Sequence, residues 1–201
     1  MASPLQTAIL NQDLGHLLHE LLFEQVPFVF SGAWPTYRSW RMGLATGLEV
    51  DPSEIIIVGS AAVGFSLSPT KGLRPFDKTS DIDVAVISHH FFSQAWHHLR
   101  SIDLTLDPLT PAQKAAVVDH QKRYIYWGCI ATDKLLPVMP FANPWLVARS
   151  VAANMAPTQD RVVNFRIYAD LSALRGYQML GLKRLRAALL DPEGDPGAEL
   201  P

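Results

Sequence analysis

The amino-acid sequence predicts an α/β (α+β) domain in which helices flank a small mixed β-sheet. Two short apolar runs rich in β-branched residues, Ile55–Val58 and Ile82–Ile87, are typical of buried strands. Segments with helical spacing of apolar residues precede and follow them, as in residues 14–25 and Leu171–Leu190. Because 48% of the 201 residues are hydrophobic and only 18% are charged, the chain can bury the core of one such domain.

The N-terminal part of the chain is expected to be helical. Leucines recur at helical spacing over residues 14–25, and Pro27 ends the pattern. A second helix is expected over residues 35–48, followed by a turn at residues 51–53. The strand Ile55–Val58 comes directly after this turn, so the helical segment leads straight into the sheet.

The second expected strand, Ile82–Ile87, carries two carboxylates at its entrance. Side chains two apart on a strand point to the same face, so Asp81 and Asp83 project together. The apolar side chains of Ile82 and Val84 face the other side. A helix is expected to follow, from about residue 91 to residue 100.

The rest of the chain is expected to hold two more helices and one more strand. A capping box at residues 110–113 begins a helix that we expect to extend to residue 136, because Pro137 follows. A proline-rich connection then leads to a strand over residues 162–168 and a closing helix over Leu171–Leu190. One face of this last helix is basic and carries Arg175, Lys183, Arg184 and Arg186.

We expect three parts: an N-terminal helical segment (1–50) that packs on the core, the core with its C-terminal helix (51–190), and a disordered tail (191–201). The single cysteine, Cys129, excludes an intramolecular disulfide and a cysteine-based zinc site. A net charge of −2 argues against a surface that coats nucleic acid broadly. The sequence shows neither a leader pattern nor an apolar run of membrane-spanning length, so we expect a cytoplasmic protein without membrane contact.

Residues 55–88 combine two features that suit a phosphate and metal site. A glycine lets the backbone approach a ligand closely, and Gly59-Ser60 follows the first strand at the start of a helix-compatible segment. Carboxylates on one strand face, as expected for Asp81 and Asp83, are ligands that Mg²⁺ prefers. The alternative is that these two acids merely form an ordinary turn at a strand entrance.

This stretch, IIIVGS followed by SDIDVAVI, resembles the nucleotidyltransferase superfamily typified by DNA polymerase β. The resemblance covers about a sixth of the chain and implies a polymerase β-like fold. It implies that Gly59 and Ser60 bind phosphate and that Asp81 and Asp83 are catalytic metal ligands. The implied reaction uses Mg²⁺ or Mn²⁺ to transfer a nucleoside monophosphate from an NTP, such as ATP, to an acceptor hydroxyl, with release of pyrophosphate.

The chain departs from the family pattern in two ways. The first is a long insertion, LSPTKGLRPFDKT, whose Lys71 and Lys78 we expect to assist in binding phosphate. The second concerns the third carboxylate, which most active members place on a later neighbouring strand. Asp170 is the nearest candidate for this catalytic position, but it also suits an ordinary N-cap of the helix that begins at Leu171. Weaker candidates are Asp103, Asp107 and Asp119.

Two functions therefore stay open at the level of sequence. The first is a nucleotidyltransferase whose acceptor is a protein, an RNA or a small molecule. The second is a weak or inactive relative that binds a nucleotide or a protein partner, or forms a homo-oligomer. By resemblance alone, the second suits a toxin–antitoxin or antiviral (phage-defence) system.

Other polar groups allow both a functional and a plain interpretation. His90 and His97 share a helix face, but a solvated helix surface explains them as well as a metal site. Arg166 either contacts a nucleotide or lies on the exposed side of a strand. The pair Lys122-Arg123 either binds RNA or phosphate, or is solvated.

Overall fold

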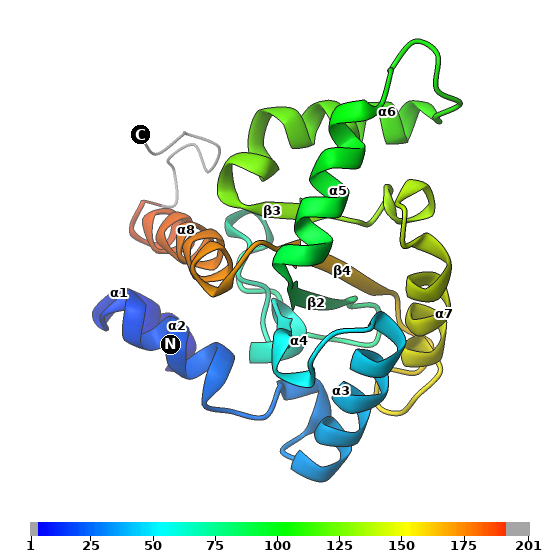
Figure 1. The fold of residues 1–201 in the computed structure, drawn as a ribbon. Coiled ribbons are helices and arrows are strands. Elements are labelled where there is room, and N and C mark those ends of the chain that lie inside the picture. Colours follow the sequence, from blue (N-terminus) through cyan, green and yellow to red (C-terminus); the bar gives the residue numbers. More distant parts are fainter. Residues whose placement is uncertain (1–3, 192–201) are drawn as a thin grey trace.

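The protein contains a mixed sheet within a layer of helices, as the computed structural model describes for residues 4–191 (Figure 1). Its strands are β1 (Ile55–Val58), β2 (Ile82–Ile87), β3 (Cys129–Ala131) and β4 (Val163–Tyr168). Their order in the sheet is β1-β2-β4-β3. β2 pairs antiparallel with β1 and parallel with β4, and β3 pairs antiparallel with β4. The predicted small mixed sheet with flanking helices is therefore confirmed.

Helices surround this sheet on both sides. They are α1 (Pro4–Asn11), α2 (Leu14–Phe23), α3 (Trp34–Leu48), α4 (Ser60–Val63), α5 (His89–Ser101), α6 (Pro111–Asp119), α7 (Ala142–Ala153) and α8 (Leu171–Leu190). Figure 1 shows α1 and α2 beside α8, and α3 alongside α7. The α5 helix packs against β3 and β4, while α8 contacts β2, β3 and β4.

The two faces of the sheet have different chemistry. On one face, Val84 is fully buried and Phe165 packs edge-on against Trp145 of α7, with ring centroids 5.5 Å apart. This face supplies the core, as the period-2 alternation of a half-buried strand requires. The opposite face is polar and carries Asp81, Asp83, Asn164 and Arg166. There α8 covers one end of the sheet, where Tyr177 contacts Tyr168 at 6.0 Å between ring centroids.

The predicted helix over residues 110–136 is confirmed as helical as far as Trp127 and is wrong beyond it. Its capping box is present, since the Thr110 hydroxyl accepts from the Gln113 N–H at 3.2 Å. After Asp119 the chain continues as a π-turn and a short 3-10 turn and then reverses at Gly128, which has φ 61°. Glycine adopts this left-handed conformation at little cost. The apolar run that follows forms β3 instead of a further helical turn, because β4 offers it an open edge.

The connection between β3 and β4 contains α7, a helix that the sequence interpretation missed. Prolines around it suggested an irregular segment, but Pro144 lies in the first turn of the helix, where a missing N–H costs nothing. The short α1 helix was also missed. Arg186 of α8 fixes the C-terminal end of this helix. It donates to the carbonyl oxygen of Ile9 in α1 and to that of Gln12 just after α1.

Most other expected elements are confirmed. β1, β2 and α8 have the predicted bounds, and α3 and β4 agree within a residue. The α2 helix ends at Phe23, slightly before the predicted end. The expected tail lies, apart from Asp191, outside the described residues. Among residues 4–191, no helix has the length and apolar character needed to cross a membrane.

Candidate functional site

The turn after β1 brings Gly59 against the carboxylate of Asp83. β1 and β2 are antiparallel with Val58 opposite Asp83, so the residue after Val58 must pass beside that aspartate. Gly59 has φ 65° and ψ −150°, a region that is essentially restricted to glycine. A Cβ added here would lie 3.1 Å from Asp83 Oδ2. The two halves of the sequence motif thus meet in space, and the glycine is what lets them meet.

A row of polar side chains crosses the open face of the sheet. Asp83 of β2 pairs with Asn164 of β4. On the far side of β4, Ala131 pairs with Arg166, and the Thr132 N–H donates to the Phe165 carbonyl at 3.1 Å. Asp133 follows two residues after the end of β3, in a turn, and lines the same cleft as Asp83 and Asn164.

These groups line one cleft of about 320 Å³ between the sheet, the loop that follows α4 and helix α8. The polar side chains that line it are Ser60, Ser66, Ser68, Lys71, Asp83, Asp133, Asn164, Arg166, Tyr177, Gln178 and Arg184. The cleft therefore brings together carboxylates and cations from five separate parts of the chain, a mixture suited to a phosphorylated ligand with its metal ion.

Arg166 forms a fixed positive charge on the floor of this cleft. Its guanidinium lies 5.0 Å from the ring centroid of Tyr177 and 5.8 Å from that of Tyr124, so the two rings hold it in place. Within residues 4–191 no carboxylate forms an ion pair with it. Its donors are therefore available to a ligand, and a planar guanidinium suits phosphate oxygens.

The pKa of Asp83 is raised above its ordinary value of 3.8. Desolvation by the walls of the cleft is the main cause, although solvent still reaches the carboxylate through the cleft mouth. The positive charges of Arg166 and Lys71 oppose the rise, and the negative charges of Asp133 and Asp81 add to it. Concentrated negative charge of this kind favours binding of a cation.

The donors fit a magnesium ion that takes part of its coordination from a ligand. Within residues 4–191, no three histidine, cysteine, aspartate or glutamate side chains lie close enough together to hold a metal. Asp83 belongs to β2 and lines the cleft, whereas Asp81 lies just before β2 and is not part of the cleft lining. Asn164 Nδ2 donates to Asp81 Oδ2 at 3.5 Å. Mg²⁺ usually binds one or two carboxylates and completes its shell with water and substrate phosphates. The residues thus fit such an ion but do not form a closed cage.

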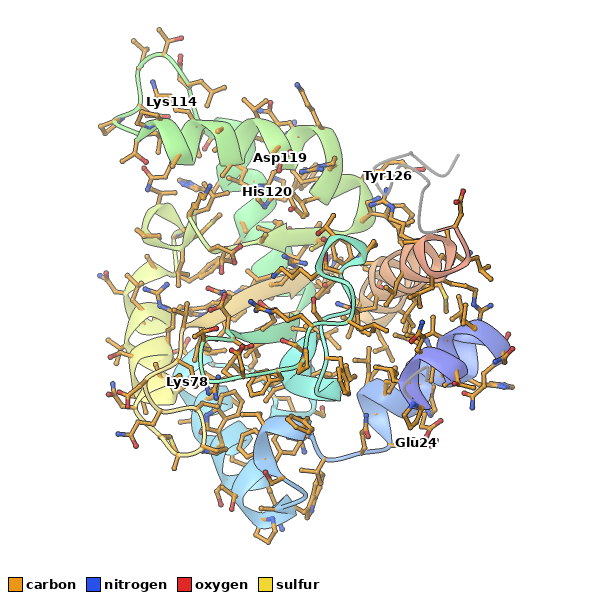
Figure 2. The ribbon with its side chains drawn as sticks, turned by 180° about the vertical axis from the view of Figure 1, so that it is seen from behind. Glu24, Lys78, Lys114, Asp119, His120 and Tyr126 are labelled. Atoms are coloured by element: carbon orange, nitrogen blue, oxygen red, sulfur yellow. The ribbon has the colours of Figure 1, made fainter. Side chains whose placement is uncertain are left out.

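The structure places the other predicted site residues differently, since Asp81, Lys78 and Asp170 do not line this cleft. Lys71 lines it, but Lys78 does not and lies on an exposed surface loop (Figure 2). The Asp170 carboxylate accepts from the Ala173 N–H at 2.7 Å, which makes it the N-cap of α8, and it does not line the cleft. Asp119 pairs with Arg123 at 2.8 Å at the end of α6 and does not line the cleft.

Asp133 is the acid that sequence reasoning missed. The sequence predicts that Asp133 lies inside the helix over residues 110–136, where the neighbouring residues do not indicate a site. The run GCIATD contains the pattern that could have indicated it: a glycine, a short apolar segment and then an acid. The strand at Ile82 likewise has acids, Asp81 and Asp83, beside an apolar run. Asn164 was also missed, because an amide in a strand has no distinctive pattern.

No protein-family model, curated protein or solved structure matches this chain. The geometry of the cleft is therefore the basis for an assignment of function.

Proposed function

We propose that the cleft binds a nucleoside triphosphate with Mg²⁺ and transfers its nucleoside monophosphate to an acceptor hydroxyl. The observation that carries this proposal is the meeting of Gly59 and Asp83 in one cleft, where the turn passes so close to the carboxylate that an added Cβ would lie 3.1 Å from Asp83 Oδ2. Gly59, Ser60 and Asp83 all line this cleft, whose volume of about 320 Å³ leaves room for phosphate. Lys71 and Arg184 line the same space and supply positive charge.

Each group has a role in this reaction. Gly59 and Ser60 hold phosphate oxygens, and Asp81 with Asp83 would hold the magnesium ion. When bound, that ion neutralises phosphate charge and lowers the pKa of the acceptor hydroxyl. Arg166, clamped between its two tyrosine rings, faces the charge that develops on the phosphoryl group.

We assign the general base to Asp133 in place of Asp170. Asp133 lines the cleft opposite Asp83, whereas the carboxylate of Asp170 is engaged at the start of α8. The acceptor hydroxyl gives its proton to Asp133 while its oxygen bonds to the α-phosphorus. The bond from that phosphorus to the bridging oxygen breaks at the same step, and pyrophosphate leaves with the electron pair.

A second candidate is a protein that binds the nucleotide without efficient turnover. Asn164 favours it, because the strand next to β2 carries an amide at the level of Asp83. An amide cannot accept a proton from the acceptor. Under this alternative Asp133 is too far from the reacting hydroxyl to replace the missing acid.

The two candidates are separated by measuring binding and turnover in the same preparation. Each nucleoside triphosphate is titrated into the full chain with Mg²⁺ and with Mn²⁺, and pyrophosphate release is followed with protein, RNA and small-molecule acceptors. Asp83→Asn should lower release by about 10²-fold or more. Arg38→Gln, on the exposed side of α3, is the control. Binding without release would favour the second candidate, and absence of binding would refute both.

A further inference from the structure

A second pocket adjoins the nucleotide cleft on the side of α6. It has a volume of about 650 Å³, within the range of small-molecule sites. The polar side chains that line it are Lys114, Asp119, His120, Lys122, Tyr124, Asp133 and Lys134. Asp133 lines both this pocket and the cleft, so the acid assigned as general base stands where the two spaces meet.

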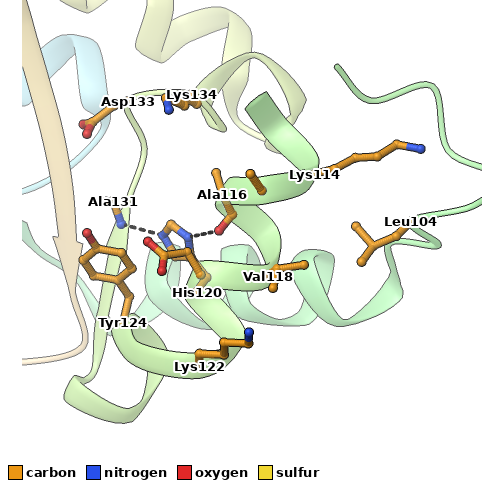
Figure 3. A pocket seen from close by; sticks show the side chains of 12 residues that line it. Leu104, Lys114, Ala116, Val118, His120, Lys122, Tyr124, Ala131, Asp133 and Lys134 are labelled. Atoms are coloured by element: carbon orange, nitrogen blue, oxygen red, sulfur yellow. Dashed lines mark hydrogen bonds between the residues drawn. The ribbon is translucent and has the colours of Figure 1, made fainter. Parts of the chain in front are cut away.

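Two residues of this pocket, Asp133 and Tyr124, also take part in the cleft. Figure 3 shows the Asp133 carboxylate and the Tyr124 ring on the side of the pocket that faces β4, with Lys114 and Lys122 on the other side. The Tyr124 ring lies 5.8 Å from the Arg166 guanidinium inside the cleft. A molecule in this pocket therefore reaches Asp133, which also lines the cleft.

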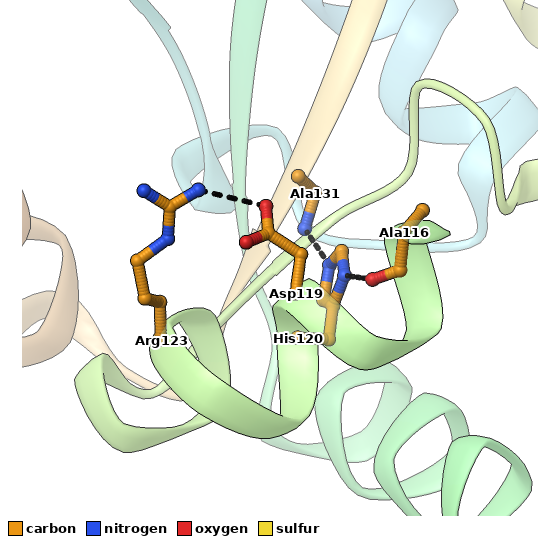
Figure 4. A network of polar contacts seen from close by, with 5 residues as sticks. All are labelled: Ala116, Asp119, His120, Arg123 and Ala131. Atoms are coloured by element: carbon orange, nitrogen blue, oxygen red, sulfur yellow. Dashed lines mark hydrogen bonds and ion pairs between the residues drawn. The ribbon is translucent and has the colours of Figure 1, made fainter. Parts of the chain in front are cut away.

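The pocket is electropositive. Three lysines line it, and Asp119, its other acid besides Asp133, is already neutralised by Arg123 at 2.8 Å (Figure 4). In the described part of the chain, none of the three lysines forms an ion pair. Unpaired ammonium groups around a cavity favour a ligand with several negative charges, and lysine is a common phosphate binder.

The end of β3, two residues before Asp133, is bonded to a buried histidine. The buried His120 ring accepts from the Ala131 N–H at 2.9 Å through Nε2. Its Nδ1 therefore carries the proton and donates to the Ala116 carbonyl at 2.6 Å. This bridge ties the last residue of β3 to α6, so the lysine-bearing wall and Asp133 keep a fixed relation.

We infer that this pocket binds the acceptor and that the acceptor is a hydroxyl compound that carries phosphate. The lysines hold its phosphate while a free hydroxyl lies beside Asp133 at the opening into the cleft. Both a small phosphorylated sugar and the phosphorylated end of an RNA present this chemistry. The inference rests on the proposed nucleotidyltransfer, because it needs a nucleotide on the far side of Asp133.

The test measures phosphate binding with the nucleotide cleft already filled. Ribose 5-phosphate, ribose and a 5′-phosphorylated trinucleotide are titrated by calorimetry into the full chain saturated with Mg²⁺ and a non-hydrolysable ATP analogue. At least one phosphorylated probe should bind and ribose should not. Lys122→Gln and Lys134→Gln should each weaken its binding about tenfold. Arg38→Gln removes one charge from α3, outside both spaces, and should leave its binding unchanged.

The outcomes distinguish this inference from the function on which it rests. Preferential binding of ribose 5-phosphate identifies a small acceptor, whereas preference for the trinucleotide identifies an RNA end. If the ATP analogue binds but neither phosphorylated probe does, or if the lysine variants bind the probes as tightly as the natural chain, the acceptor pocket is refuted. If the ATP analogue itself fails to bind, the proposed function has failed. Circular dichroism of each variant confirms that it is folded.

Discussion

At the scale of single residues, Gly59 joins the phosphate-binding turn to the carboxylate of Asp83. Its backbone conformation and the 3.1 Å approach of its missing Cβ act in the same direction, since each excludes a side chain. The close approach of this turn to Asp83 therefore needs a residue without a side chain at position 59. Arg166 is the complementary case, because two tyrosine rings fix its charge without consuming its hydrogen-bond donors.

Replacing Gly59 by alanine should destabilise the fold by about 1–3 kcal/mol, because ψ −150° at positive φ is strained for any residue with a Cβ. Nucleotide binding should fall as well, since the new methyl group displaces Asp83. Urea unfolding and calorimetry measure the two effects. Gly176→Ala in α8 is the matched control, because open space surrounds its added Cβ and alanine favours a helix. Equal stability of the two variants would contradict the strain.

The stability of the protein should fall in mildly acidic solution because of His120. Burial holds the pKa of His120 below its ordinary value of 6.5, although its hydrogen bond to the Ala116 carbonyl opposes the shift. Below pH 6.5 the unfolded chain therefore takes up this proton before the folded protein does. The free energy of unfolding decreases with falling pH until the lower pKa of the folded state is passed. Above pH 6.5 this group has no effect.

Urea unfolding of the natural chain and of His120→Gln at a series of pH values checks this expectation. Glutamine can bridge the same two backbone groups but does not titrate. The natural chain should lose more stability than the variant between pH 6.5 and pH 5. Parallel curves for the two proteins would contradict the assignment.

At the scale of elements, the sequence predicts a helix or strand correctly where the local residue pattern and the tertiary contacts favour the same structure. The capping box at Thr110, the β-branched run at β1 and the amphipathic α8 are of this kind. The helix prediction is wrong after Trp127, because there the local helical pattern competes with pairing to a distant strand. β4 presents an unpaired edge, and Gly128 allows the chain to reverse and pair with it. No local pattern shows that edge, so the pairing of β3 with β4 and the place of Asp133 in the cleft could not be predicted from the sequence.

Gly128→Ala tests this account of the β3 turn. Alanine at φ 61° costs about 1–2 kcal/mol, and its Cβ would lie 2.9 Å from the Cβ of Ala173 in α8. We expect a loss of more than about 2 kcal/mol on urea unfolding, together with weaker nucleotide binding because Asp133 moves. Gly43→Ala in α3 meets no atom within 4 Å and is the control. A variant as stable as that control would exclude a strained turn.

At the scale of the whole molecule, the cleft is assembled from segments that are distant in the chain. β1 and β2 supply Gly59 and Asp83, β4 supplies Arg166, and α8 closes one side with Arg184. The sequence motif covers only the first two of these. The remaining members depend on strand order β1-β2-β4-β3, which sequence reasoning left undetermined. A local motif can therefore indicate where phosphate binds and still not show which acid completes the reaction.

Substitution of the two rival third carboxylates discriminates between their roles. Asp133→Asn keeps the shape of the side chain but cannot take a proton, so pyrophosphate release should fall by about 10²–10⁴-fold. Stabilisation of the fold by Mg²⁺ with ATP should persist in a thermal melt, because the phosphate-binding groups are intact. Asp170→Asn is the matched control, since asparagine caps a helix as well as aspartate does and this carboxylate lies at the N-terminus of α8. It should keep the natural rate.

The reverse result, with Asp170→Asn inactive and Asp133→Asn active, would move the base from the turn after β3 to the start of α8. Equal loss in both variants, with nucleotide binding retained, would indicate that the third acid acts through the fold and not through proton transfer.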